Sequence, residues 1–235
     1  MLVSTRLLFP NFAFTWLSIE NKESILPTDI FQNLTQDIIK ELKLEKGVES
    51  SMSVFLLEFE GKKALFDAGF FKDGSKGLLD RFSELRISPD DIDYIFITHF
   101  HWDHIAGLID PNDNIVFKNA KVYVSKEEYD GWINKMPEDK NQIQKKITKI
   151  YEKQIIQFDF NDKLPLGIIP IKSFGHTPGH TCYRKDDVLI VGDLIISEDI
   201  HFKYTDISTK FDTHGLLIGH EDLRDLRRLP ADMFL

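Results

Sequence analysis

Short apolar runs separated by polar and turn residues predict several β-strands along the chain. Residues 3–17 are predicted to be a first strand region. Residues 52–59 and 62–69 are two apolar runs separated by Glu60-Gly61, a spacing that predicts a β-hairpin. Further strands are predicted at 93–98, 121–125, 155–158, 167–172, 181–184 and 187–193.

Three other segments carry apolar residues at helical spacing. The first is residues 29–42, with Asp29 in a position to cap the N-terminus. The second is residues 75–86, followed by a Ser-Pro-Asp-Asp turn at 88–91 with helix-capping chemistry. The third, residues 126–153, is charged and is expected to break near Pro137, because a helix interior does not tolerate proline.

The order of these elements is neither a strict alternation of strand and helix nor an all-β meander. It predicts an α/β architecture in which two sheets pack together and are covered by helices. Since no internal repeat, low-complexity segment or linker divides the 235 residues, we expect a single domain over 1–235.

Composition limits the kinds of partner that the chain is expected to bind. The formal net charge of −9 disfavours nucleic acid as the main partner, because phosphate binding needs a surplus of Lys and Arg. No stretch reaches the roughly 20 apolar residues of a membrane span, so no membrane partner is expected. The chain has a single cysteine, Cys182, so an internal disulfide is excluded, which is compatible with a reducing compartment. Cys182 is expected to be a small buried side chain of the core. We therefore expect a cytoplasmic protein, with the mature form of a secreted protein as the alternative.

The most informative segment is THFHWDHIAG at 98–107, which follows an apolar strand. His99 and His101 are two residues apart, so both can point the same way as the chain leaves the sheet. Two imidazoles on one side supply half of a tetrahedral metal site. Asp103 and His104 project differently as the backbone turns into a short helix, and the segment therefore predicts two adjacent metals.

Two later segments add candidate ligands. In SFGHTPGHT at 173–181, a turn rich in Gly and Pro presents His176 and His180 after an apolar strand. His176 is the predicted ligand, and His180 is predicted to brace the turn or the site. In LIVGDLI at 189–195, Asp193 follows a buried strand and supplies the acid that a two-metal site still lacks.

Together these segments resemble the metallo-β-lactamase superfamily of metal-dependent hydrolases. The resemblance rests on LFDAG (65–69), THFHWDH (98–104), GHTPGH (175–180), VGD (191–193) and IGHED (218–222), which occur in the order of the family. It implies a four-layer αββα sandwich of two mixed β-sheets flanked by helices, with a dinuclear metal site at the sheet edge.

By position, the resemblance implies seven metal ligands and two supporting residues. The ligands are His99, His101 and His176 on the first metal, Asp103, His104 and His220 on the second, and Asp193 as the bridge. Asp67 and His180 would lie beside the site without binding a metal. Nitrogen and carboxylate ligands of this kind suit two Zn²⁺ ions, with Fe or Mn as alternatives.

His220 is the open position of this set. It matches the C-terminal Gly-His of the family, but only a short stretch separates it from Asp193, where family members usually carry an additional helix. His201 and His214 therefore stay as alternatives for the last ligand.

The implied reaction is attack of a metal-bound hydroxide on the carbonyl carbon of an ester, lactone, thioester or amide. Asp103 would orient the nucleophile and pass a proton to the leaving group. Residues 12–33 and 53–70 resemble the quorum-quenching lactonases, so a lactone or ester is the expected small-molecule substrate. Against this, Ile196 stands where those lactonases often carry a Tyr.

Several alternatives stay open at this point. A glyoxalase II-like thioesterase and a β-lactamase-type amidohydrolase use the same chemistry. If the second metal site is lost, a single-iron oxygenase-like enzyme or a non-catalytic metal-binding protein would result. The aromatic residues Phe100, Trp102, Phe202 and Tyr204 either line an acyl pocket or belong to the core. The oligomeric state is also open, with a homodimer as one alternative.

Overall fold

A computed structural model of the chain describes residues 4–19, 24–71 and 77–213. It divides into two compact units that interleave along the sequence. The first unit combines residues 1–22 with 51–162, and the second combines residues 23–50 with 163–235. The prediction of one domain over the whole chain stays a prediction.

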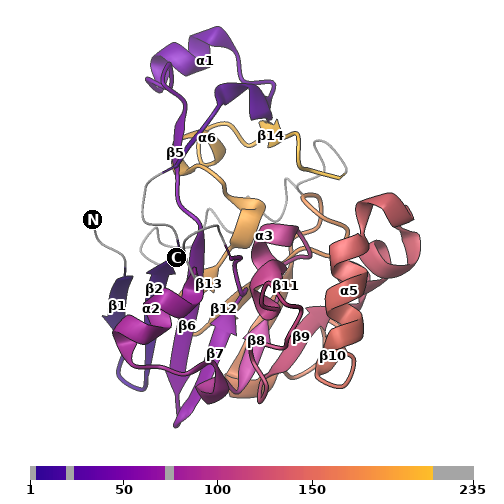
Figure 1. Cartoon of the computed structure of the whole chain (residues 1–235). Helices are drawn as coiled ribbons and strands as arrows, with labels where there is room; N and C mark the ends of the chain where they lie inside the picture. The colour runs from indigo at the N-terminus through magenta and orange to yellow at the C-terminus, as the bar shows by residue number, and fades with distance from the viewer. Residues whose placement is uncertain (1–3, 20–23, 72–76, 214–235) are drawn as a thin grey trace. The chain divides into compact units, whose positions relative to one another are not determined.

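A seven-stranded mixed sheet forms the centre of the first unit (Figure 1). In spatial order its strands are β1 Ser4–Leu8, β2 Phe12–Ser18, β6 Ser53–Phe59, β7 Lys62–Phe66, β8 Tyr94–Phe96, β9 Lys121–Ser125 and β10 Ile155–Phe158. The pairs from β1 to β7 are antiparallel, and those from β7 to β10 are parallel. The first predicted strand region is thus two paired strands.

The predicted hairpin between β6 and β7 is confirmed. Its turn residues Glu60 and Gly61 have φ values of 51° and 74°. Two positive φ values in succession are the backbone that a two-residue hairpin needs, because this turn matches the twist of the flanking strands. Glycine reaches such values without steric cost, which accounts for its place in the turn.

Short helices complete the first unit. Its described helices are α2 Leu78–Leu85, α3 Trp102–Ile105, α4 Lys126–Tyr129 and α5 Gln142–Ile150, with a π-helical segment at Asp130–Lys135 and 3₁₀ turns at Pro89–Asp91, Ala106–Leu108 and Glu138–Lys140. The capping turn at 88–91 is confirmed, because Ser88 and Asp91 form a capping box. The predicted break near Pro137 is also confirmed.

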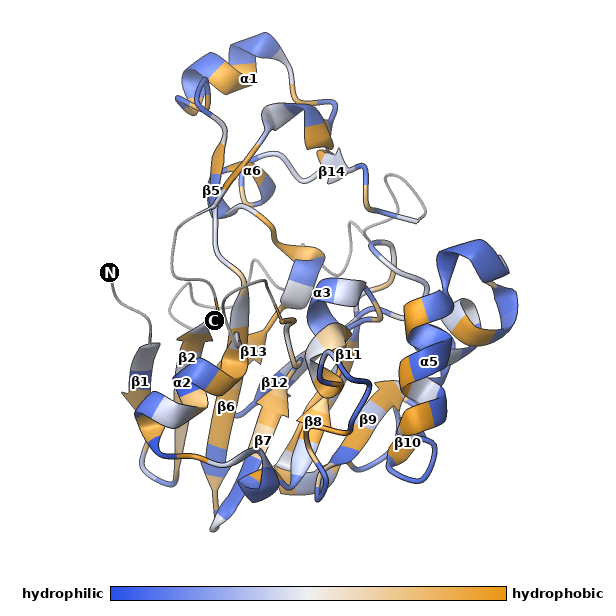
Figure 2. Cartoon of the chain, viewed as in Figure 1, coloured by the Kyte–Doolittle hydropathy of each residue, from blue (hydrophilic) through white to orange (hydrophobic). Residues whose placement is uncertain are grey.

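Both faces of the seven-stranded sheet carry buried apolar side chains. On one face, Leu65 and Ile95 belong to a core that includes Phe82 of α2. On the other face, Phe66 and Phe96 stack with their ring centroids 5.5 Å apart. Figure 2 shows the same pattern as a concentration of hydrophobic residues on the central strands. The sheet is therefore a rigid platform for the residues that follow its strand ends.

The second unit contains a three-stranded antiparallel sheet and two short ribbons. The sheet consists of β11 Ile169–Lys172, β12 Thr181–Lys185 and β13 Val188–Ile190, and the ribbons pair β3 Ser24–Leu26 with β5 Val48–Ser50 and β4 Phe31–Gln32 with β14 Ser208–Thr209. Its helices are α1 Gln36–Glu41 and α6 Glu198–His201, with 3₁₀ turns at Thr28–Ile30, Pro165–Gly167 and Gly192–Leu194.

The helix predicted at 29–42 with Asp29 as its cap is wrong in its first half. Asp29 lies in a 3₁₀ turn, and β4 pairs with β14 instead of continuing as helix. Asn33 then adopts a left-handed backbone with φ of 65°. Helix α1 starts only after Thr35, whose side chain accepts a hydrogen bond from Ile38 N. A strand partner some 175 residues away in sequence therefore overrides the local helical spacing.

The large mixed sheet with its helices confirms the predicted α/β class. Among the helices that the structure describes, none is long and apolar enough to cross a membrane.

Candidate metal centre

The ends of two parallel strands bring the first candidate residues together. Asp67 comes directly after β7, and Thr98 and His99 come shortly after its neighbour β8. Asp67 N donates to Phe96 O at 3.0 Å, so the two chains still pair where the strands end. Because parallel strands end at the same edge of a sheet, residues from both segments meet there.

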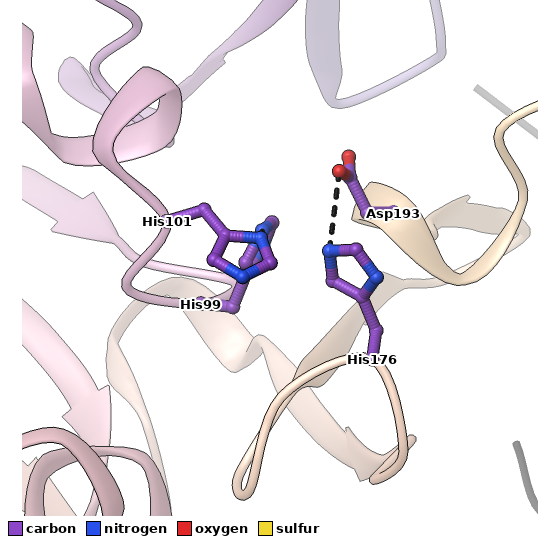
Figure 3. Close-up of side chains that lie close together, drawn as sticks. All are labelled: His99, His101, His176 and Asp193. Carbon is purple, nitrogen blue, oxygen red and sulfur yellow. Dashed lines mark hydrogen bonds and ion pairs between the residues drawn. The ribbon is translucent and has the colours of Figure 1, made fainter. Parts of the chain in front are cut away.

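The side chains of His99 and His101 lie close together, as Figure 3 shows. His99 Nε2 lies 3.0 Å from His101 Nδ1, and the ring of His99 is fully buried. Two nitrogens on one tetrahedral Zn²⁺, each at about 2.0–2.1 Å from the ion, would be roughly 3.3 Å apart. The observed separation is close to that value, so the two imidazoles fit a shared divalent ion.

Asp67 organises the residues around this pair. Its Oδ2 accepts hydrogen bonds from His104 Nδ1 and from Thr98 Oγ1, both at 2.7 Å. Its Oδ1 accepts from Thr98 N at 2.7 Å. A carboxylate that accepts from Nδ1 fixes the tautomer and the ring orientation of His104. Asp67 thus holds both His104 and Thr98, and its role beside a metal stays a prediction.

Helix α3 carries the remaining candidates of the first unit. His101 precedes α3, Asp103 lies in its first turn and is half-buried, and His104 lies in its last turn and is buried. Trp102 is 55% exposed and packs on Phe70 with ring centroids 4.8 Å apart. Phe100, by contrast, is buried in the core.

His176 is the centre of the candidate residues in the second unit. Its Nδ1 donates to Asp212 Oδ1 at 2.6 Å, and its Nε2 lies 3.3 Å from Asp193 Oδ2 (Figure 3). Burial opposes protonation of this ring, but the hydrogen bonds and charges of Asp193 and Asp212 outweigh it and raise the pKa of His176 to about 9. An Nε2 atom at this distance from a carboxylate oxygen fits two ligands of one divalent ion.

His180 contacts its surroundings through both ring nitrogens. Its Nδ1 lies 2.7 Å from Ser173 Oγ, and its Nε2 accepts from Asp193 N at 3.2 Å. These bonds tie the turn after β11 to the turn that carries Asp193. The supporting role of His180 stays a prediction.

Asp212 is the functional candidate that the sequence did not reveal. Its side chain is only 3% exposed, and besides His176 it accepts from Thr209 N at 2.6 Å through Oδ2. Burial raises the pKa of Asp212, but these hydrogen bonds lower it below its usual value overall. Thr213 N also donates to His176 O at 3.0 Å, so this segment holds both the ring and the backbone of His176. No motif marks Asp212, because its role depends on a contact across 36 residues.

Of the three histidines considered for the last ligand, the structure describes His201. His201 is buried at the end of α6, and its Nδ1 lies within hydrogen-bond distance of both Ser197 N and Ser197 O. Burial lowers the pKa of His201. His214 and His220 lie outside the described residues. Cys182 is fully buried in a small core with Leu189 and Leu194, as predicted.

Comparison with known proteins identifies the family to which the chain is similar. A sequence profile of the family described as the Metallo-beta-lactamase superfamily matches residues 49–235. The matched region contains both pairs of side chains drawn in Figure 3.

Two curated relatives illustrate how far sequence similarity extends. A protein named "Probable metallo-hydrolase MJ0296" from Methanocaldococcus jannaschii is 31% identical over 122 residues, which are 52% of this chain and 46% of that protein. Ribonuclease Z from Nanoarchaeum equitans is 32% identical over 127 residues, 54% of this chain and 32% of that enzyme. The chain spans less than half the length of the curated relatives it matches.

Among solved structures, the chain is similar to AidC, described as a dizinc quorum-quenching lactonase in complex with a product of the N-acyl-L-homoserine type. The TM-score is 0.82 at 26% sequence identity, and the alignment covers 97% of this chain and 87% of AidC.

Proposed function

The chain belongs to the metallo-β-lactamase superfamily, and from this membership we propose that it is a metal-dependent hydrolase that opens a lactone or cleaves a related carbonyl ester. One observation carries the proposal above the others. The nitrogens of His99 and His101 converge to 3.0 Å at a strand end, inside the segment that matches the family. Such a pair has the geometry and the chemistry of a divalent-metal site.

We propose that His99, His101 and His176 hold a first metal, that Asp103, His104 and His220 hold a second, and that Asp193 bridges the two. The hydrogen bond to Asp67 uses Nδ1 of His104, so Nε2 is the nitrogen with which His104 would bind. His176 would bind through Nε2, because its Nδ1 donates to Asp212. His220 enters this set only by its position in the sequence.

Zn²⁺ is the proposed metal, since imidazole and carboxylate ligands suit it, and Fe or Mn would be compatible with the same donors. When bound, a divalent ion of this kind lowers the pKa of a water toward about 7 and polarises a carbonyl oxygen. The residues of the chain would supply the rest. Asp103 would orient the attacking water and transfer its proton to the leaving oxygen.

Two observations support a lactone with an apolar acyl chain. AidC, to which the chain is similar over nearly its whole length, is described as a lactonase with an acyl-homoserine product. The exposed ring of Trp102, packed on Phe70 and next in sequence to His101, offers an apolar surface beside the proposed site. A flat aromatic surface of this kind can hold an alkyl chain by burying its methylenes.

A phosphodiester is the second candidate, because relatives such as ribonuclease Z act on nucleic acid. The net charge of −9 favours the small-molecule substrate over this alternative, since a polyanion would be repelled by the acidic surface. A thioester substrate and a β-lactam would require the same attack on a carbonyl carbon and remain further alternatives.

A substrate panel with a metal assay tests the proposal. The purified protein would be assayed against N-hexanoyl-homoserine lactone, a glutathione thioester, bis(p-nitrophenyl) phosphate and a chromogenic β-lactam. Bound metal would be counted by elemental analysis, with chelator-treated protein as the control. We expect lactone hydrolysis and two metals per chain. Phosphodiester cleavage without lactone hydrolysis would refute the proposed substrate, and one bound iron would refute the dinuclear mechanism.

A further inference from the structure

We infer that Glu128 and Gln144 are positioning residues, which hold the peptide between His99 and His101 in the geometry that a metal requires. This inference rests on the proposed function in one respect, because it takes these two histidines as ligands. It adds two residues that belong to none of the family segments and lie on α4 and α5, far from the histidines in sequence.

The contacts act on Phe100, the residue between the two histidines. Phe100 N donates to Glu128 Oε1 at 2.6 Å, and Phe100 O accepts from Gln144 Nε2 at 2.7 Å. Both polar side chains are buried, with Glu128 fully enclosed and Gln144 only 3% exposed. Two buried side chains thus hydrogen-bond the N–H and the C=O of Phe100.

These two bonds restrict the backbone from which both imidazoles extend. The N–H of Phe100 belongs to the peptide plane shared with His99, and its C=O belongs to the plane shared with His101. A peptide plane is rigid, so holding two successive planes restricts the backbone dihedrals between the two histidines. Strand β8 ends at Phe96, and at Phe100 side chains replace the neighbouring strand as hydrogen-bond partners. Glu128 and Gln144 thus continue at Phe100 the hydrogen bonding that β9 and Asp67 provide at Ile97 and Thr98.

Glu128 and Gln144 are themselves held in place by other contacts within the first unit. Helix α4 starts at the end of β9, where Ser125 Oγ accepts from Glu128 N at 3.2 Å. Before α5, Asn141 Nδ2 donates to Trp132 O at 2.7 Å and so ties α5 to the π-helical segment Asp130–Lys135. That segment places the ring of Trp132 against the ring of His101, with centroids 5.6 Å apart and the planes nearly perpendicular. π-Helical insertions are frequent at functional sites.

Burial of both polar side chains carries a cost in stability. Burying a carboxylate is costly even when it is hydrogen-bonded. Among the described residues, Gln144 Oε1 is buried without a hydrogen-bond partner, which also lowers stability. A methionine of similar volume would avoid that cost at position 144, but it would leave Phe100 O without this hydrogen bond. Both polar side chains thus act on the backbone of Phe100, which favours a positioning role.

Matched substitutions test this inference. Gln144→Met and Glu128→Met remove the contacts with Phe100, whereas Glu128→Gln keeps an oxygen that can accept from Phe100 N. The control is Gln154→Met, which removes an amide that donates to Phe117 O and Ala120 O in the same unit. Zinc affinity would be measured by competition with a fluorescent chelator, the ligand geometry by the absorption spectrum of the Co²⁺ form, and folding by urea unfolding of the metal-free protein.

We expect Gln144→Met and Glu128→Met to weaken zinc binding by about 10–100-fold and to change the Co²⁺ spectrum, as loss of an outer partner of a metal ligand typically does. Gln154→Met and Glu128→Gln should stay within about threefold of the unchanged protein. If Gln144→Met and Glu128→Met bind zinc normally and alter only the unfolding free energy, the contacts are structural and the inference fails.

A measurement on the unchanged protein covers the case in which a variant does not fold. Amide hydrogen exchange at Phe100 should be slow in the metal-free protein, and exchange at the rate of an unfolded chain would overturn the inference. None of these readouts needs a substrate. If the affinities follow the expected order but no lactone is cleaved, the positioning role stands and the proposed substrate fails. A protein that binds neither Zn²⁺ nor Co²⁺ overturns both.

Discussion

Replacing Asp212 by Asn gives the most direct test of how His176 is held. The substitution keeps the size of the side chain and removes its charge. The carboxylate of Asp212 lies 2.6 Å from His176 Nδ1 and is almost fully buried. We therefore expect Asp212→Asn to destabilise the metal-free fold, and to do so only over part of the pH range.

The magnitude follows from the pKa of His176. Against the opposing effect of burial, Asp193 and Asp212 raise this pKa from 6.5 to about 9. One pKa unit corresponds to about 1.4 kcal/mol, so the shift is worth roughly 3 kcal/mol of unfolding free energy. Two carboxylates share this effect, and we expect the loss of one charge to cost about 1–2 kcal/mol, in line with a buried charge-assisted hydrogen bond.

The sign of the pH dependence is determined by the raised pKa. Because the folded state binds the His176 proton more tightly than the unfolded state, the stabilisation is fully present below pH 6.5 and is lost as the pH rises through about 9. Urea unfolding of chelator-treated protein at pH 6 and pH 10 would measure this, with Asp199→Asn, an exposed acid of the same unit, as the control. A destabilisation by Asp212→Asn that is absent at pH 6, or equally large at pH 10, would refute the reasoning.

Three further predictions address the site and the core. His101→Ala should reduce lactone hydrolysis to background while the circular dichroism and the melting temperature stay near those of the unchanged protein, because the ring is half-buried after a strand end; surviving activity would exclude the metal mechanism. Asp67→Asn should cost about 1–3 kcal/mol in urea unfolding and weaken zinc binding about 10–100-fold, since it weakens the bonds to His104 and Thr98; unchanged zinc affinity would contradict its supporting role. Phe82→Ala should lower the unfolding free energy by about 3–5 kcal/mol and leave zinc affinity unaltered, because Phe82 is a fully buried core residue; a loss near zero would show that the site repacks.

Much of the scaffold is predictable from short stretches of sequence. The turn at Glu60-Gly61 and the capping box at Ser88 and Asp91 depend on neighbouring residues, and both occur where the sequence predicts them. The HxHxDH spacing likewise predicts that His99 and His101 point the same way, because the two-residue period of an extended backbone is a local property. These features need no information about the rest of the chain.

Contacts between distant segments decide the remainder. Pairing of β4 with β14 displaces the start of α1 to Thr35, although the local spacing favours a helix from Asp29 onward. The partners that orient the histidines also come from elsewhere in the sequence, as Asp212 does for His176 and Gln144 does for the peptide of Phe100. A hydrogen bond of this kind requires only that a donor and an acceptor meet, and no periodicity records which residues will meet.

Local sequence thus predicts the candidate ligands and the strand ends that carry them, because residue type and strand period are set by covalent neighbours. The direction of each imidazole follows from the folded chain, because it depends on buried hydrogen bonds that exist only after folding.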